Sequence, residues 1–208
     1  MKKSAEGLVG IQYFIFMSLH QIIINPGIYF ITFTNLAWLP LIQLSDGYAV
    51  VYKWFDILKE KGHVVTGYVG MPNHLHAFLY YSGGHQSLNT IIGNAKRFMA
   101  YEIVARLEQA GNKKIIARLQ KDVRTKDKNR GKRHEVWKDA FDVKECRTEK
   151  FILQKLNYIH NNPCSGNWKL ADDPTHYIHS SASFYISGKK GIYGVKDYRE
   201  FINFDDEE

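Results

Sequence analysis

The stretch "HVVTGYVGMPNHLHAFLYY", residues 63–81, most constrains the fold of this 208-residue chain. Two runs rich in β-branched and aromatic residues, 63–70 and 74–81, are separated only by the three residues "MPN". So short a connection, with a proline and an asparagine in it, is typical of a β-hairpin. We therefore predict two neighbouring antiparallel strands, around which any sheet in this protein has to be built.

The segments before this hairpin predict one strand and one helix. The turn signal "NPG" precedes a strand at 28–34, which is rich in aromatic and β-branched residues. A helix is predicted over 45–62, with Ser45 or Asp46 as the N-cap. Its apolar face is expected to consist of Val50, Val51, Trp54, Ile57 and Leu58.

The segments after the hairpin complete the pattern. A second helix is predicted from about Ser87 to Gly111, and "EVWKDAFDVKEC", residues 135–146, is expected to hold a fourth strand. A last helix begins at the N-cap Thr148 and has to stop before Pro163. The resulting order matches the split βαβ arrangement of ferredoxin-like domains, so we predict an α+β fold with an antiparallel sheet covered by helices.

The positive charge of the chain is concentrated in one segment. The net charge is +7 and the pI is near 9.2, but residues 112–134, here called the basic insert, carry ten basic and two acidic residues. The insert is expected to be either a loop or a weak helix. It favours a polyanionic partner, although charge alone does not separate nucleic acid from a membrane surface.

Cysteine usage and hydropathy limit the class of protein. Cys146 and Cys164 show neither a CxxC pairing nor zinc-finger spacing, which indicates no disulfide framework and no structural zinc. No run is long enough to span a bilayer, so we expect a cytoplasmic protein that does not bind membranes. Residues 1–26 are predicted to form a dispensable N-terminal extension, and the glycine-rich, then acidic, residues 186–208 a peripheral C-terminal tail.

His74 and His76 are the first candidate site residues. Because residues i and i+2 of a strand point to the same face, the two imidazoles are expected to lie side by side, where they can bind one metal ion. The alternative is a pair of half-buried histidines that only satisfy neighbouring groups.

Tyr158 and Asn162 are the next candidates. They are four residues apart on the last predicted helix, so they share a face, whereas His160 points elsewhere. The amide oxygen of Asn162 can serve as a third metal ligand, although Pro163 disfavours helical geometry there and predicts a frayed end. The alternative for Tyr158 is a core tyrosine of an amphipathic helix.

Four stretches in order, "MPNHLHAFLY", "VWKDAFDV", "YIHNNP" and "SSASFY", resemble the landmarks of the REP-associated tyrosine transposases, which belong to the single-tyrosine HUH transposases. The similarity extends over residues 27–185, and the basic insert departs from the family pattern. The resemblance implies a ferredoxin-like fold with the histidine pair on a central strand. It also implies that His74, His76 and Asn162 bind Mg²⁺ or Mn²⁺ and that Tyr158 on the C-terminal helix attacks DNA.

This resemblance implies a metal-dependent transposase that nicks and rejoins single-stranded or hairpin DNA through a 5′-phosphotyrosine intermediate. The reaction would need no ATP, and the protein could act as a homodimer. The alternative is a domesticated hairpin-binding protein without cleavage activity, and a weaker one is a metal-dependent hydrolase that uses water. A protein that only binds would be free to lose His74, His76 or Tyr158. The candidate DNA contacts are Lys96, Arg97, Lys126, Lys128, Arg130, Lys132 and Arg133.

Overall fold

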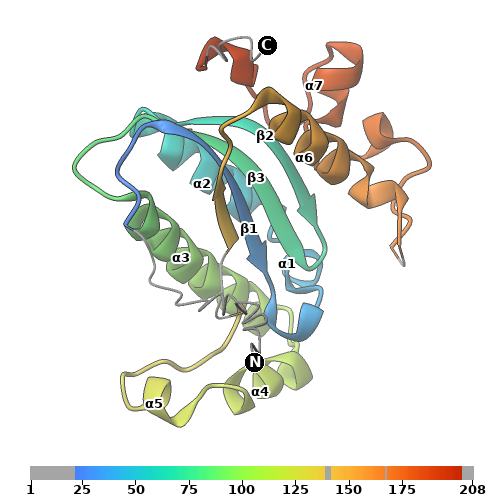
Figure 1. Ribbon diagram of the computed structural model, residues 1–208. Helices are drawn as coiled ribbons and strands as arrows, with labels where there is room; N and C mark the ends of the chain where they lie inside the picture. The colour runs from blue at the N-terminus through green and yellow to red at the C-terminus, as the bar shows by residue number, and fades with distance from the viewer. Residues whose placement is uncertain (1–21, 139–141, 167, 203–208) are drawn as a thin grey trace, which may run out of the picture.

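Four antiparallel strands form one sheet in the order β2-β3-β1-β4 (Figure 1). The computed structural model describes residues 22–138, 142–166 and 168–202. The β2–β3 hairpin confirms the prediction from the "MPN" stretch. The strands are β1 (Gly27–Thr34), β2 (Val64–Met71), β3 (His74–Tyr81) and β4 (Asp142–Glu145).

Strands β1 and β2 run parallel to each other but are separated in the sheet by β3. Strands β3 and β4 likewise run parallel but are separated by β1. β1 and β2 both run antiparallel to β3, and β3 and β4 both run antiparallel to β1. Helix α2 (Tyr48–Glu60) lies between β1 and β2 in the sequence, and α3 (Leu88–Gln109) lies between β3 and β4. This is the split βαβ topology, so the predicted ferredoxin-like α+β fold is confirmed.

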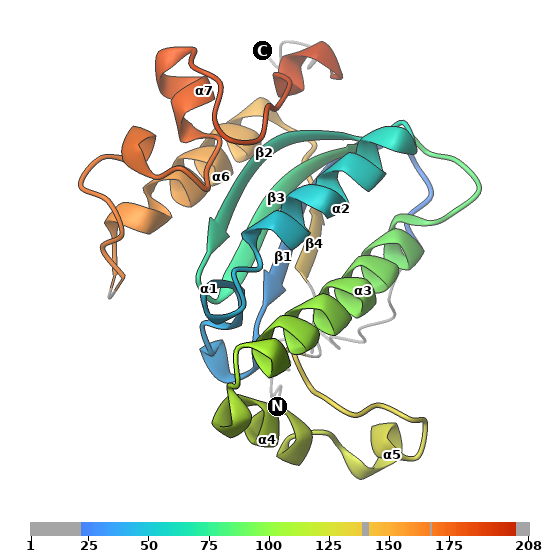
Figure 2. The ribbon, with the colours of Figure 1, turned by 180° about the vertical axis from the view of Figure 1, so that it is seen from behind.

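Helices cover both faces of the sheet. α2 and α3 cover one face, and α6 (Glu149–Asn161) crosses the other (Figures 1 and 2). Because side chains alternate along β3, Leu75 and Leu79 join the core under α2 and α3, whereas Phe78 packs in the core under α6. His74 and His76 have the same parity as Phe78 and therefore face α6.

Helix α6 approaches β2 at a glycine. β2 has a register irregularity between Val65 and Gly67 where it pairs with β3. A Cβ atom on Gly67 would lie 2.8 Å from Cδ2 of Leu156, so a larger residue here would force the Leu156 side chain of α6 to move. The helix begins as predicted, because Oγ1 of Thr148 accepts a hydrogen bond from the backbone N–H of Phe151.

The start of α2 differs from the prediction. The N-cap is Gly47, which has no side chain to cap the helix, and a short helix α1 (Leu41–Leu44) precedes it. Ser45 is occupied elsewhere, because its hydroxyl donates a hydrogen bond to the carbonyl of Leu41 at 2.7 Å. Asp46 has a φ of +47°, which is a left-handed conformation rather than the extended one of an N-cap.

The predicted apolar face of α2 is wrong at one position. Ile57 is 41% exposed, whereas Phe55 is fully buried among Trp54, Tyr68 and Tyr193. Helix α2 therefore turns Phe55 instead of Ile57 toward the core, because an aromatic side chain buries the larger apolar surface.

The basic insert is helical. It forms α4 (Lys113–Lys121) and α5 (Thr125–Lys128), and Leu119 of α4 is completely buried. Ion pairs stabilise both, between Arg118 and Asp122 at 2.8 Å and between Arg124 and Asp127 at 2.7 Å.

The predicted fourth strand is confined to β4. Residues 135–138 instead run beside the end of β1, where the N–H of Lys138 donates to the carbonyl of Thr34 at 2.8 Å.

The described parts of both chain ends pack on the domain. The backbone N–H of Ile23 donates to Oδ1 of Asn89 at 2.8 Å, while the predicted extension before residue 22 lies outside the described residues. The C-terminal tail is not peripheral over 186–202, because Tyr198 is 1% exposed and its hydroxyl donates to Glu149 at 2.7 Å. No described helix is long and apolar enough to cross a membrane. The remaining elements are α7 (Ala182–Ser187) and the 3-10 turns η1 (Leu36–Trp38), η2 (Asn162–Cys164), η3 (Pro174–His176) and η4 (Tyr198–Glu200).

Candidate active site and nucleic-acid interface

His74 and His76 lie side by side at the start of β3. Their ring centroids are 4.8 Å apart, and each residue is 7% exposed. β3 is an interior strand, so the backbone on both sides is held by β1 and β2. The predicted common face of the two imidazoles is therefore present.

Both histidines are held through Nδ1. Nδ1 of His74 lies 2.7 Å from Oδ1 of Asn73, and because that oxygen only accepts, Nδ1 donates and Nε2 keeps its lone pair. Nδ1 of His76 lies 2.8 Å from the hydroxyl of Thr32, its partner on β1. Hydrogen bonds of this kind fix the ring orientation of histidines that bind metals through the other nitrogen.

Both imidazoles are neutral at neutral pH. Burial lowers the pKa of His74 to about 4. The pKa of His76 is lowered to about 3, first by burial and then by His74 and by the positive charge of Lys155. A neutral imidazole is the form that ligates a metal ion, so these environments keep the pair ready to bind one.

Asn162 lies beside this pair. Its Nδ2 is 3.1 Å from Nε2 of His74, across 88 residues of sequence. The predicted fraying before Pro163 does not occur, because Asn162 keeps helical angles (φ −56°, ψ −43°). α6 passes directly into η2, where Pro163 lies in the first turn and its missing N–H has no partner to lose.

The donor set fits a divalent ion. Among the described residues no three His, Cys, Asp or Glu side chains gather in a metal-binding group, so a third protein donor for an ion at this pair would be of another type. Asn162 can supply one. If its side-chain amide rotated by half a turn, Oδ1 instead of Nδ2 would lie next to Nε2 of His74, which carries the lone pair. Two imidazoles with one amide oxygen suit Mn²⁺ and are compatible with Mg²⁺.

Tyr158 projects from the last turn of α6. It is 53% exposed, and its ring centroid is 5.6 Å from that of His76. The alternative of a core tyrosine is therefore wrong. His160 points the other way, as predicted: it is buried, and its Nε2 lies 2.9 Å from the hydroxyl of Ser181.

Lys155 is a site residue that the sequence did not single out. Its Nζ lies 5.6 Å from the ring centroid of Tyr158 and 5.5 Å from that of Phe30. The i, i+3 spacing to Tyr158 on one helix could have identified it. Thr32 could not have been identified this way, because its contact with His76 depends on the β1–β3 register.

Trp38 was also missed. It is 52% exposed, and its ring centroid lies 5.8 Å from that of His74. Ala37 and Trp38 both have left-handed φ values, +48° and +58°, which are costly for residues with a Cβ. The amide of Asn73 donates to the carbonyl of Trp38 at 3.2 Å, so one asparagine holds both Trp38 and His74.

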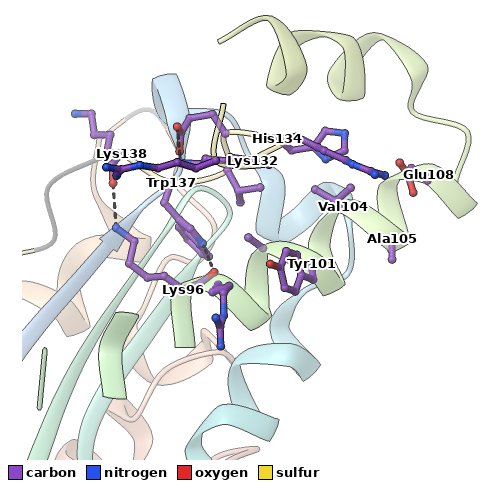
Figure 3. A pocket seen from close by; sticks show the side chains of 16 residues that line it. Lys96, Tyr101, Val104, Ala105, Glu108, Lys132, His134, Trp137 and Lys138 are labelled. Carbon is purple, nitrogen blue, oxygen red and sulfur yellow. Dashed lines mark hydrogen bonds and ion pairs between the residues drawn. The ribbon is translucent and has the colours of Figure 1, made fainter. Parts of the chain in front are cut away.

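A pocket of about 750 Å³, here called the α3 pocket, brings together most of the predicted DNA contacts (Figure 3). It lies between α3 and residues 130–138. Lys126 and Lys128 lie on α5 and do not line it. The predicted contacts that line it are Lys96, Arg97, Arg130, Lys132 and Arg133.

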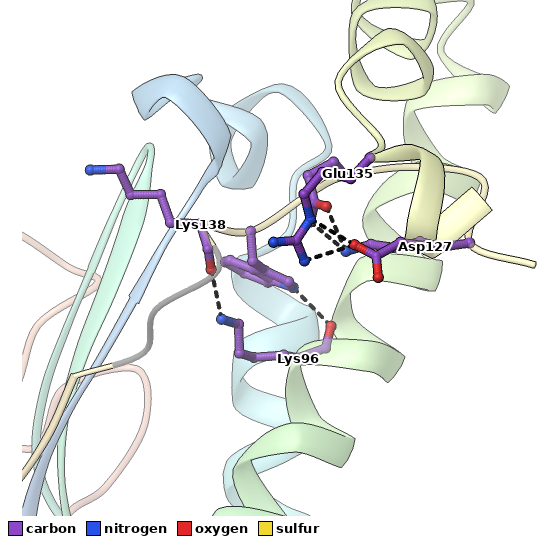
Figure 4. A network of polar contacts seen from close by, with 7 residues as sticks. Lys96, Asp127, Glu135 and Lys138 are labelled. Carbon is purple, nitrogen blue, oxygen red and sulfur yellow. Dashed lines mark hydrogen bonds and ion pairs between the residues drawn. The ribbon is translucent and has the colours of Figure 1, made fainter. Parts of the chain in front are cut away.

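Hydrogen bonds fix the wall of this pocket to α3 (Figure 4). The indole N–H of Trp137 donates to the carbonyl of Lys96 at 2.8 Å, and Nζ of Lys96 donates to the carbonyl of Lys138 at 3.0 Å. Lys132 pairs with the buried Glu135 at 2.6 Å. Residues 132–138 are thus an ordered surface rather than a solvated loop.

Comparison with known proteins gives structural matches only. No family model and no curated protein matches the sequence. A REP-associated tyrosine transposase bound to a REP hairpin is structurally similar, with a TM-score of 0.51 over 83% of this chain and 87% of that chain, at 14% identity. A proposed transposase from Deinococcus radiodurans matches over 66% of this chain and 91% of that chain, with a TM-score of 0.35 and 15% identity. The first match confirms the fold expected from the resemblance, and the second carries no argument.

Proposed function

We propose that this protein is a transposase-type DNA strand transferase that nicks and rejoins single-stranded or hairpin DNA, with Tyr158 as the nucleophile. One observation carries the proposal: His74, His76 and Asn162 converge on the face of the sheet where an exposed Tyr158 stands. They do so in the fold of a REP-associated tyrosine transposase whose structure contains a REP hairpin.

The residue types suit this reaction. The phenol oxygen of Tyr158 forms a bond to phosphorus and gives up its proton, while the bond from phosphorus to the 3′ oxygen breaks and that oxygen leaves as a hydroxyl. The product is a 5′-phosphotyrosine, which keeps the energy of the broken ester for rejoining, so no ATP is needed. A divalent ion held by His74, His76 and Asn162 would polarise the scissile phosphate.

Lys155 supports the same step from the side of the helix. Its ammonium group lies beside the ring of Tyr158, where negative charge develops on the attacking phenol and on the phosphate oxygens. A positive charge placed where charge develops lowers the barrier. Lys155 also contributes to keeping His76 neutral.

The test is whether Tyr158 becomes covalently attached to DNA. We expect the wild-type protein, incubated with a labelled hairpin carrying a single-stranded foot and with Mn²⁺ or Mg²⁺, to give a labelled band in denaturing electrophoresis. Tyr158→Phe should give none and should melt at nearly the wild-type temperature, since the exposed ring is retained.

Tyr177→Phe is the matched control. The Tyr177 hydroxyl donates to the carbonyl of Gly70 at 2.7 Å, so it is engaged in a structural hydrogen bond, and this variant should still be labelled. A labelled Tyr158→Phe protein would show that another residue attacks. If the wild type bound hairpins but was never labelled, the domesticated hairpin-binding protein would be the better assignment.

A further inference from the structure

The α3 pocket is electropositive. Six cationic side chains line it, against two acidic ones, Glu108 and Glu135. Glu135 is already paired with Lys132, and Arg130 and Arg133 are exposed. Lys96 and Glu108 stand twelve residues apart on α3, which makes the pocket roughly 18 Å long. It is therefore an elongated basic surface suited to a chain of phosphates.

The pocket also carries an exposed aromatic ring. Tyr101 points into it from α3 and is 63% exposed (Figure 3). Arg97, one helical turn earlier, lines the same wall. An exposed tyrosine among cationic side chains is an arrangement that can stack an unpaired base between phosphate contacts.

A continuous set of contacts leads from this pocket to the candidate active site. Lys138 lines the end of the pocket near Lys96, and its Nζ lies 4.7 Å from the ring centroid of Trp38. Trp38 in turn stands edge-on to His74. A strand bound in the pocket would therefore continue across a second exposed aromatic ring to the residues that surround Tyr158.

From these observations we infer that the α3 pocket binds an unpaired segment of DNA, with a base stacked on Tyr101 and phosphates on Arg130 and Arg133. A single strand fits better than a duplex, since a duplex buries its base faces and leaves the exposed rings of Tyr101 and Trp38 without a partner. The inference deepens the proposed function, on which it rests for the identity of the nucleic acid, by assigning the unpaired part of the substrate to the basic insert.

Tyr101 is tested by fluorescence anisotropy of the full-length protein in EDTA, so that binding is measured without cleavage. The probes are a labelled oligothymidylate of about ten nucleotides and a blunt hairpin with no unpaired foot. Tyr101→Ala should weaken binding of the oligothymidylate at least about fivefold, whereas Tyr101→Phe, which keeps the ring, should bind it as the wild type does. Neither change should alter binding of the blunt hairpin by more than about twofold.

The two arginines are tested against two lysines of the same insert. Arg130→Gln with Arg133→Gln should lower the slope of log affinity against log salt by about 1.4, because each lost phosphate contact removes about 0.7 for single strands. Lys113→Gln with Lys114→Gln removes the same charge from α4, outside the pocket, and should change the slope by less than about 0.7.

Three results would overturn the inference: unchanged binding by Tyr101→Ala, an equal loss on the blunt hairpin, or tighter binding of the same sequence as RNA. These outcomes can be told apart from a failure of the proposed function. If the wild-type protein formed no covalent adduct but its binding still depended on Tyr101, the transferase assignment would be refuted and the assignment of the α3 pocket would stand. If the adduct formed but binding did not depend on Tyr101, the assignment of the α3 pocket would be refuted and the transferase assignment would stand.

Discussion

The side-chain nitrogen Nδ2 of Asn162 lies 3.1 Å from Nε2 of His74, which joins the end of α6 to the first residue of β3. The proposed set of metal donors is therefore complete only when α6 is docked on the sheet. The same helix carries Tyr158, so the positions of the proposed nucleophile and of the proposed third donor are both set by the packing of α6 on the sheet.

His74→Ala and His76→Ala are each expected to abolish metal-dependent adduct formation in a folded protein. Removing one imidazole from a set of three donors takes away much of the hold on the ion. Asn162→Ala should have a smaller effect, since water can replace a neutral amide oxygen, and Asn162→Asp should bind Mn²⁺ more tightly through its charge. Calorimetry with Mn²⁺, beside the adduct assay, measures both. Adduct formation at the wild-type rate by either alanine variant would refute the metal site.

Lys155→Met is expected to lower the rate of adduct formation by about tenfold or more. Methionine keeps most of the apolar packing against Phe30 and removes only the charge near Tyr158. Lys150→Met is the control, because Lys150 is an exposed lysine of the same helix for which no contact with the Tyr158 ring is found. Equal rates in the two variants would return Lys155 to a purely structural role.

The elements of the fold were predictable because their signals are local. The "MPN" turn fixed the β2–β3 hairpin, Ser87 and Thr148 accept the hydrogen bonds expected of N-caps, and the i, i+2 spacing of His74 and His76 determined their common face. Where the local signal was ambiguous the prediction failed. Ser45 is a good N-cap residue by type, but its hydroxyl bonds to the turn before it instead.

The contacts between distant segments were not predictable. The pairing of Thr32 with His76 depends on the register of β1 against β3. The contact of Trp38 with His74 depends on the left-handed conformations of Ala37 and Trp38, which follow β1. The α3 pocket requires the basic insert to fold back along α3 through Trp137, which no periodicity in the insert indicates. Site residues on one element could thus be predicted, and the groups that surround them could not.

His160→Ala is expected to destabilise the protein by about 1–3 kcal/mol. Nε2 of His160 lies 2.9 Å from Oγ of Ser181, and that hydroxyl also accepts from the N–H of Tyr68 on β2. The buried imidazole therefore fastens α6 to the edge strand. Thermal melting measures the loss, and His176→Ala, at an exposed histidine paired with Asp172, should change the melting temperature little. Equal shifts in the two variants would contradict the anchoring role.

Stability in EDTA is expected to fall as the pH drops below about 6.5, the ordinary histidine pKa. Burial lowers the pKa of His74 and of His160 to about 4, and that of His76 to about 3. The unfolded chain therefore binds more protons than the folded one in this range, so the stability present above pH 6.5 is lost on acidification, by about 1–2 kcal/mol per histidine near pH 5. Urea unfolding at several pH values measures this. The variant His74→Gln with His76→Gln should show a shallower dependence, and a slope as steep as that of the wild type would contradict the cause.

Trp38→Ala is expected to weaken adduct formation on a hairpin with a single-stranded foot, while Trp38→Phe retains most of it. The indole is half exposed and held in a left-handed conformation beside His74, an arrangement that costs stability and that a base stacked on its face would explain. Loss of one stacking contact costs about 1–3 kcal/mol, so the concentration of DNA needed for half-maximal labelling should rise at least about fivefold in the alanine variant. The rate at saturating DNA should change less, because the residues around Tyr158 are untouched. Trp168→Ala, at a partly buried tryptophan that packs in the core under α6, controls for the general loss of an indole, since it should lower the melting temperature without changing the half-maximal concentration. If Trp38→Ala lowered only the melting temperature, the strained turn at Ala37 and Trp38 would have no part in binding DNA.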